Sequence, residues 1–181
     1  TGDTYNSVVG QGYVGATPLQ VLTSIATLAN GGRVMWPHLV QQVLDVEGNV
    51  IQRFGPYVLW DISDGVVIDR SQIAQGCPSL PEETRQTIID GHDVTPDVNV
   101  DPRVIELARE AMRLVVEHPE GTAHDYAQLE SISSAGKTGT GEFCDAEAFA
   151  AGRCPPGNFP THSWYTAFAP FENPEIVVVA F

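Results

Sequence analysis

The residue types that could do chemistry gather between Ser133 and Glu142, in the stretch Ser-Ser-Ala-Gly-Lys-Thr-Gly-Thr-Gly-Glu. Lys137, the only lysine of the chain, lies there among small residues and glycines, which let another backbone approach closely. Alternate side chains of a strand point to opposite faces, so an extended segment would turn Lys137 one way and Thr138 and Thr140 the other. Two hydroxyls on one face with an ammonium group nearby favour the binding of a carboxylate.

A phosphate-binding loop is the first alternative, because the Gly-Lys-Thr sequence at 136–138 matches the end of its motif. That motif requires a glycine at position 131, where this chain has Ser131. It also requires a helix after the threonine, which aims backbone amides at the phosphate. Gly139 and Gly141 follow instead, and glycine disfavours a helix, so we set this alternative aside.

A serine nucleophile is the second alternative, because Ser134 and Lys137 have the Ser-x-x-Lys spacing of serine acyltransferases. That spacing works when a helix brings the two side chains onto one face. The glycines and threonines of this stretch favour an extended segment, in which residues three apart lie roughly 10 Å from each other on opposite faces. We therefore interpret the match as a coincidence.

The size and charge of the chain limit the class of protein. Its 181 residues could form one domain with a hydrophobic core. A formal net charge of -14 argues against nucleic acid or an anionic membrane as a partner. The sequence contains neither an apolar run of roughly 20 residues nor a signal sequence at its start. We expect a piece of a longer protein, because a bare apolar strand at 176–181 would leave an exposed edge.

Two helices and several strands must position the lysine stretch, which predicts an α+β fold. One helix is expected to open with a capping box of Thr17 and Gln20 and to end at Asn30, and the other to run from Asp101 to about His118. Strand segments are expected at 34–36, 39–46 and 50–54, and two more at 162–169 and 175–181 complete an antiparallel set with the lysine strand. Loops are expected at 1–16 and 143–161, and a short helix at 81–89.

Seven short motifs, one of them within the lysine stretch, occur in order along the chain. They are Gly2-Asp3-Thr4, Gly10-Gln11-Gly12-Tyr13, Ala16-Thr17-Pro18-Leu19-Gln20, Ala29-Asn30-Gly31-Gly32, Gly121-Thr122-Ala123, Ala135-Gly136-Lys137-Thr138-Gly139-Thr140 and Thr166-Ala167-Phe168-Ala169-Pro170. The series resembles the C-terminal half of the transpeptidase domain of class B penicillin-binding proteins, and is most similar to the elongation-type penicillin-binding protein 2. The resemblance covers residues 1–53 and 101–181. Residues 54–100 carry no family motif, so we expect an insertion or irregular segment over 55–100 of a single partial domain, 1–181.

The resemblance implies a partial penicillin-binding-protein or serine β-lactamase-like fold, in which an antiparallel sheet, here with three C-terminal strands, packs with helices. In that family a serine attacks the penultimate D-Ala of a peptidoglycan stem peptide, and β-lactams acylate the same serine. Lys137 would supply positive charge near the leaving group and the substrate carboxylate, which the hydroxyls of Thr138 and Thr140 would bind. The backbone N–H of Thr140 would be one of two oxyanion donors, and Gly139 would let the substrate lie antiparallel along the strand.

Two motifs of the resembled family are missing from this chain. Its helical Ser-x-x-Lys and its Ser-x-Asn both belong upstream of residue 1, and no Ser-x-Asn occurs here. We therefore expect the chain to carry the substrate-binding strand without the nucleophile or base, and the isolated chain to be inactive. A β-lactamase or β-lactam sensor of the same fold, or a non-catalytic binding module, are the alternatives.

The resemblance also implies ligands, partners and a location. We expect the stem peptide and β-lactams as ligands, and the upstream part of the same protein and the cell-elongation machinery as partners, with no nucleic acid, metal or cofactor. The expected location is extracytoplasmic, with an anchor in an N-terminal segment absent from this chain. Because disulfides persist there, Cys144 and Cys154 are candidates for a disulfide, with zinc ligands or free thiols as alternatives, and Cys77 would then be free or buried.

Overall fold

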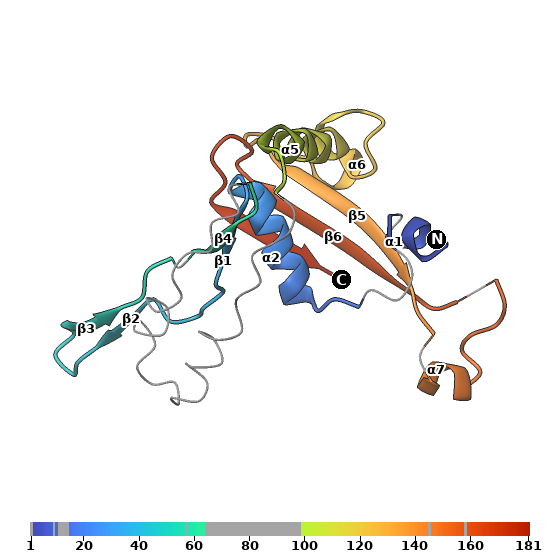
Figure 1. Cartoon of the computed structure of the whole chain (residues 1–181), viewed down its shortest axis with the longest axis horizontal. Helices are drawn as coiled ribbons and strands as arrows, with labels where there is room; N and C mark the ends of the chain where they lie inside the picture. The colour runs from blue at the N-terminus through green and yellow to red at the C-terminus, as the bar shows by residue number, and fades with distance from the viewer. Residues whose placement is uncertain are drawn as a thin grey trace. The chain divides into compact units, whose positions relative to one another are not determined.

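The computed structural model describes residues 2–8, 10, 15–56, 58–63, 99–144, 146–157 and 159–181 (Figure 1). Its elements, in chain order, are α1 (Gly2–Val8), α2 (Pro18–Ala29), β1 (Arg33–Met35), β2 (Gln42–Leu44), β3 (Val50–Arg53), β4 (Val58–Asp61), α5 (Pro102–Glu117), α6 (His124–Ala127), β5 (Ala135–Glu142), α7 (Ala146–Ala150), β6 (Thr161–Ala169) and β7 (Ile176–Ala180). The chain divides into two compact units, Thr1–Ile25 with Arg109–Phe181, and Ala26–Ala108. This mixture of helices and antiparallel strands confirms the predicted α+β class.

The first unit contains a three-stranded antiparallel sheet in the order β5–β6–β7. β5 pairs with β6 over 135–142 against 161–168, and β6 pairs with β7 over 165–169 against 176–180. The two long ribbons β5 and β6 lie side by side in Figure 1. The three consecutive strands predicted from the sequence are therefore confirmed, with β7 one residue shorter at each end than expected.

The core of this unit joins the second half of α5 to β6. Phe168 on β6 and Val116 on α5 are its largest fully buried side chains. Arg109 of α5 is 9% exposed, and its guanidinium carbon lies 5.3 Å from the ring centroids of both Phe168 and Phe171. Its Nη2 also donates a 2.8 Å hydrogen bond to the carbonyl of Phe171. The arginine therefore attaches α5 both to β6 and to the turn that follows it.

The predicted start and end of α2 are confirmed. Thr17 N donates to Gln20 Oε1 at 2.8 Å, and Gln20 N donates to Thr17 Oγ1 at 3.3 Å, which is a reciprocal capping box. After Ala29 the chain turns through Gly31 and Gly32, with φ of 80° and 113°. Glycine adopts these angles without the strain that a Cβ would introduce, so the helix ends where the glycines begin.

The start of α5 also follows the sequence prediction. Asp101 caps it, since its Oδ1 accepts a 2.8 Å hydrogen bond from Arg103 N, and Pro102 takes the first helical position. The Arg103 side chain pairs with the same carboxylate at 2.6 Å. Hydrogen bonds from the side chain and then the backbone of Arg103 lower the pKa of Asp101. The helix ends at Glu117, one residue before the predicted end.

In the second unit the strand prediction needs a correction. β2 and β3, which lie within the strand segments expected at 39–46 and 50–54, form a hairpin whose turn is closed by Asn49 N and Nδ2 bonding to the Asp45 carboxylate at 2.8 and 2.9 Å. β1 is not part of it, because β1 pairs antiparallel with β4 instead. β4 lies within the segment expected to be irregular, and residues 39–41, expected to be strand, lie outside any strand. Short strands such as β4 show too little periodicity in the sequence to be recognised.

Three short helices also lie where no helix was predicted. α1 occupies part of the loop expected at 1–16, α7 part of the loop expected at 143–161, and α6 follows the Gly-Thr-Ala motif. Each consists of four to seven residues, a length at which tertiary contacts rather than propensity decide the conformation. The helix expected at 81–89, Cys77 and the Gln11-Gly12-Tyr13 part of the second motif lie outside the described residues.

Candidate functional site

The candidate site is the exposed side of β5. Lys137 lies opposite Thr166, Thr138 opposite Tyr165 and Thr140 opposite Ser163 in the antiparallel register with β6. Among the described strands, β6 is the only neighbour of β5, so β5 forms one edge of the sheet. An edge strand has backbone N–H and C=O groups on its outer side with which an extended ligand can pair.

The two faces of β5 carry the groups that the sequence assigned to them. A Cβ built on Gly139 would lie 3.4 Å from the Cβ of Trp164, which places Trp164 on the face of Lys137 and Gly139. The other face carries Thr138 and Thr140 beside Tyr165. Lys137, Gly139 and Thr140 are exposed and Thr138 is half-buried, so this part of the strand is accessible.

The side chain of Lys137 lies against the backbone of its own strand. Its Nζ donates a hydrogen bond to the backbone carbonyl of Thr138, the next residue. Ser134, by contrast, is buried, with 5% exposure, and precedes the first residue of β5. An exposed lysine and a buried serine do not form the one-turn helical pair that the Ser-x-x-Lys chemistry requires, so the structure agrees with our reading of that match as a coincidence.

A residue that sequence reasoning left without a role joins the site. Thr122 Oγ1 lies 2.9 Å from Thr138 Oγ1, so the two hydroxyls share a hydrogen bond. The Gly121-Thr122-Ala123 motif marked this turn in the sequence, but a contact between residues 16 apart has no local sequence signal. The structure therefore brings one further hydroxyl to the carboxylate-binding candidates.

The turn that carries Thr122 is anchored to the C-terminal end of α5. Gly121 N donates to His118 O at 2.7 Å, and Ala123 N donates to Val115 O at 3.1 Å. A Cβ on Gly121 would lie 2.3 Å from Val115 O, so only glycine fits this close approach to the helix. Ala123, at 2% exposure, is buried. Gly121 and Ala123 thus fix the backbone on both sides of Thr122.

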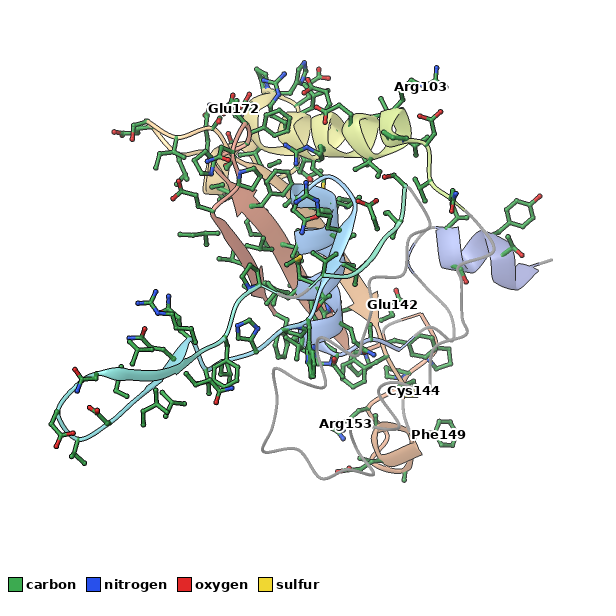
Figure 2. The ribbon with its side chains drawn as sticks, turned by 60° about the vertical axis from the view of Figure 1, so that its left-hand side comes forward. Arg103, Glu142, Cys144, Phe149, Arg153 and Glu172 are labelled. Carbon is green, nitrogen blue, oxygen red and sulfur yellow. A yellow bond between two sulfur atoms is a disulfide. The ribbon has the colours of Figure 1, made fainter. Side chains whose placement is uncertain are left out.

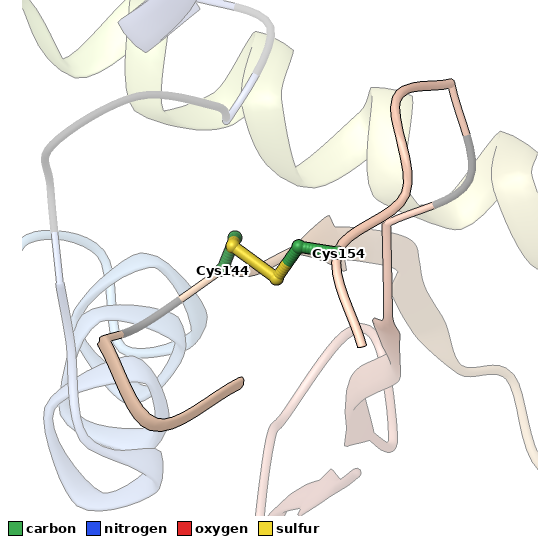
Figure 3. The surroundings of a disulfide bond; sticks show 2 residues. All are labelled: Cys144 and Cys154. Carbon is green, nitrogen blue, oxygen red and sulfur yellow. A yellow bond between two sulfur atoms is a disulfide. The ribbon is translucent and has the colours of Figure 1, made fainter. Parts of the chain in front are cut away.

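A disulfide lies just beyond the C-terminal end of β5 (Figure 3). Cys144 and Cys154 are joined with an S–S distance of 2.12 Å and a Cα–Cα distance of 6.0 Å. The loop that they close contains α7, and Figure 2 shows Phe149 and Arg153 on this loop near Cys144. Phe149 is 74% exposed, so the loop presents an aromatic side chain to solvent.

Aromatic rings stack on one another at the C-terminal end of β5 as well. Phe143, directly before the disulfide, stacks on His162 of β6 with ring centroids 4.4 Å apart. Trp164 stacks on Phe181 at 5.0 Å, on the face of Lys137 and Gly139. Trp164 is therefore held by hydrophobic packing.

Over the described ranges no group of three or more His, Cys, Asp or Glu side chains is placed to hold a metal ion. Over the same ranges, no helix combines the length and the apolar character that a membrane crossing requires.

Comparisons with known proteins find similarity along nearly the whole chain. The sequence model described as "Penicillin binding protein transpeptidase domain" matches residues 3–181. The peptidoglycan D,D-transpeptidase MrdA of Haemophilus influenzae is 29% identical, over 98% of this chain and 22% of that protein. The crystal structure of PBPA from Mycobacterium tuberculosis superposes with a TM-score of 0.59 at 23% identity, covering 96% of this chain and 28% of that one.

A second structure of penicillin-binding protein A from M. tuberculosis is an imipenem acyl-enzyme complex, with a TM-score of 0.57 and 25% identity over 96% of this chain. The structural matches confirm the fold predicted from the motifs. The chain spans about a quarter or less of the length of the curated relatives it matches, 22% of the first.

Proposed function

Because the chain belongs to the penicillin-binding protein transpeptidase domain family, we propose that it is part of a peptidoglycan D,D-transpeptidase, to which it contributes the substrate-binding strand. The resemblance to class B penicillin-binding proteins of the elongation type is confirmed by relatives such as MrdA. The observation that carries the proposal is the exposed edge strand β5 with Lys137, Thr138, Gly139 and Thr140 in the order of the family motif.

The proposed reaction cross-links stem peptides through a serine acyl-enzyme. A serine outside this chain attacks the carbonyl of the penultimate D-Ala, the terminal D-Ala leaves, and an amine of a neighbouring stem then takes the acyl group. This chain holds the substrate while the bonds change. It contains no Ser-x-Asn, and its Ser134 is buried, so the nucleophile and the base come from the rest of the protein.

Binding of the terminal carboxylate is the role we assign to the threonine face. Thr138 and Thr140 are two residues apart on one strand, so their side chains point the same way. Their hydroxyls can both donate hydrogen bonds to one anionic group, and charge-assisted hydrogen bonds of this kind are the stronger ones. Lys137 adds a positive charge to a site within an otherwise acidic chain of net charge -14. A local cation of this kind offsets the repulsion that the chain would exert on an anionic substrate.

The backbone of the edge strand supplies the remaining contacts. An extended stem peptide that lies antiparallel to β5 would pair with its outer N–H and C=O groups. Gly139 leaves room on the strand, because its exposed position has no side chain. The N–H of Thr140 is then one of two donors that stabilise the oxyanion of the tetrahedral intermediate.

β-Lactams are proposed as inhibitors of the same site. The imipenem acyl-enzyme structure of the M. tuberculosis relative, at 25% identity, supports this proposal. We also propose an extracytoplasmic location, with the anchor in a segment outside this chain and the cell-elongation machinery as a partner. The Cys144–Cys154 disulfide supports that location, because disulfides persist in oxidising compartments.

Acylation of the whole protein by a fluorescent penicillin tests the proposal. We expect a stable adduct on a serine that lies outside this chain, without appreciable hydrolysis of the drug. A Thr138→Val, Thr140→Val double variant should acylate more slowly, while a Ser131→Ala variant on the exposed loop before β5 should acylate normally. Rapid hydrolysis would indicate a β-lactamase instead, and the absence of any adduct would contradict both activities.

A further inference from the structure

We propose that Thr122 is a positioning residue for carboxylate recognition, because its hydroxyl donates a hydrogen bond to Thr138 and leaves the Thr138 proton for the ligand. The inference rests on the proposed role of β5 and assigns a function to the Gly-Thr-Ala turn. It follows from the 2.9 Å contact between the two Oγ1 atoms and from the way in which the turn is fixed.

The direction of the hydrogen bond between Thr122 and Thr138 follows from the fact that each hydroxyl has one proton to donate and two lone pairs that accept. If Thr138 donated its proton to Thr122, it could not donate it to a carboxylate. If Thr122 donates instead, Thr138 accepts with a lone pair and keeps its proton for the ligand. The ligand-binding arrangement is therefore a relay in which Thr122 donates to Thr138 and Thr138 donates to the carboxylate, and successive hydrogen bonds of this kind polarise one another.

The backbone around Thr122 is held well enough to act as a positioning device. The amide of Ala123 donates to the carbonyl of Val115 in the last turn of α5, and the amide of Gly121 donates to the carbonyl of His118, the residue directly after the helix. His124 adds a third attachment, a 3.1 Å hydrogen bond between its Nδ1 and Val116 O. Val116 is fully buried, so these contacts tie the turn to the core of the unit.

The partner hydroxyl is held as well. Thr138 lies within the continuous eight-residue pairing of β5 with β6. Thr122 itself is exposed and Thr138 is half-buried, so the pair of hydroxyls lies at the surface where a ligand can reach it. Two groups on separately fixed elements restrict the rotation of the Thr138 hydroxyl before the ligand arrives, which reduces the entropy lost on binding.

A structural role for the same hydrogen bond, joining the turn to the sheet, would affect stability but not the choice of ligand. In the positioning role the effect of losing the hydrogen bond depends on whether the ligand has a carboxylate, and in the structural role it does not. The test therefore compares acylation of the whole protein by benzylpenicillin and by its methyl ester, which has no carboxylate. The variants are Thr122→Val, Thr122→Ser, Thr138→Val and the Thr122→Val, Thr138→Val double variant.

Removing one neutral hydrogen bond should slow acylation by benzylpenicillin about 3- to 10-fold in Thr122→Val, with little effect on acylation by the ester. Thr122→Ser keeps the hydroxyl and should restore the rate. When Thr138→Val is already present, adding Thr122→Val should slow acylation no further, because the hydroxyl that Thr122 positions is gone. A Thr161→Val variant, which removes an exposed hydroxyl at the far end of the β5–β6 pairing, is the matched control and should acylate normally.

The outcomes separate this inference from the proposed function. If Thr138→Val slows acylation by benzylpenicillin but Thr122→Val does not, the carboxylate-binding strand stands and the positioning role is wrong. An equal loss with benzylpenicillin and with the ester, or losses that simply multiply in the double variant, would also overturn the positioning role. If the wild-type protein is not acylated at all, both proposals fall.

Discussion

The ring of Tyr165 occupies the space that a side chain at Gly136 would need. A Cβ at position 136 would lie 2.5 Å from the phenolic oxygen of Tyr165 and 2.9 Å from its Cε2 atom. The carbonyl oxygen of Thr166 would lie at 2.9 Å as well. The glycine directly before Lys137 is therefore required by packing within the sheet, and not only by the approach of a ligand.

The first prediction is that Gly136→Ala destabilises the protein, although alanine normally suits a strand better than glycine. Forcing a methyl group into this space should lower the free energy of unfolding by about 1–3 kcal/mol. Gly139→Ala is the matched control, because its nearest neighbour would be the Trp164 Cβ at an ordinary 3.4 Å. Chemical denaturation of the whole protein measures both. A Gly136→Ala variant as stable as the wild type would show that the ring moves aside at no cost.

The second prediction concerns the pH dependence of Tyr165. Burial raises the pKa of its phenol above the ordinary value for tyrosine, about 10. The folded state then holds this proton more tightly than the unfolded state does. The contribution of Tyr165 to stability is thus fully present below about pH 10 and lost as the pH rises through its folded-state pKa. When the free energy of unfolding is measured by denaturation at several pH values between about 9 and 11, it should fall less in Tyr165→Phe than in the wild type. An equal fall in the two proteins would contradict this prediction.

The third prediction is that Lys137→Ala slows β-lactam acylation of the whole protein by about 10- to 150-fold, the equivalent of a charged contact of about 1.5–3 kcal/mol. Thermal unfolding should change little, because Lys137 is exposed and bonds only a carbonyl of its own strand among the contacts described. Arg153→Ala removes one exposed positive charge from the nearby loop and serves as the control for net charge. Acylation of Lys137→Ala at the wild-type rate would contradict the assigned role.

The fourth prediction concerns the loop between Cys144 and Cys154. Closing a loop of this length by a disulfide is worth about 3 kcal/mol of chain entropy. A Cys144→Ser, Cys154→Ser double variant should therefore show faster amide hydrogen exchange over 146–157, with smaller changes in the paired part of β5. A thiol assay on the unreduced wild-type protein should find neither of these two cysteines free. Reaction of both with the thiol reagent would show that the pair is reduced.

The fifth prediction is that the 181-residue chain by itself forms no covalent adduct with penicillin. It has no Ser-x-Asn, and its one Ser-x-x-Lys match pairs a buried serine with an exposed lysine of a strand. Mass spectrometry after incubation with a fluorescent penicillin measures the adduct, with the whole protein as the positive control. A stable adduct on the chain alone would overturn our placement of the nucleophile.

The long, periodic elements could be predicted from the sequence to within a residue or two. α2 and α5 each have a capping side chain at the start and a clear end, and β7 is a continuous apolar run that favours a strand. The face assignments of Lys137 and Thr138 followed from the period of a strand alone. β4, α1, α6 and α7 were missed, because elements of four to seven residues depend on contacts that are distant in sequence.

The same limit applies to the site. The order of the motifs marks Lys137, Thr138 and Thr140 as candidate site residues, because a family resemblance depends on residue types along the chain. The contact between Thr122 and Thr138 depends on where α5 ends and on how the turn returns to the sheet, which no local pattern encodes. The overlap of Tyr165 with Gly136 likewise requires the register of β5 and β6.

The contact of Arg109 with the rings of Phe168 and Phe171 has a consequence for how the stability of the unit depends on ionic strength. Dissolved salt weakens the half-buried pairs of Arg113 with Glu110 and Glu117 on the same helix, because solvent and its mobile ions still reach these charges and screen them. Ions have little access to Arg109, since two aromatic rings and a carbonyl oxygen surround its buried guanidinium. The attachment of α5 to the sheet, and with it the end of α5 that fixes Thr122, should therefore hold equally well in dilute and in concentrated salt.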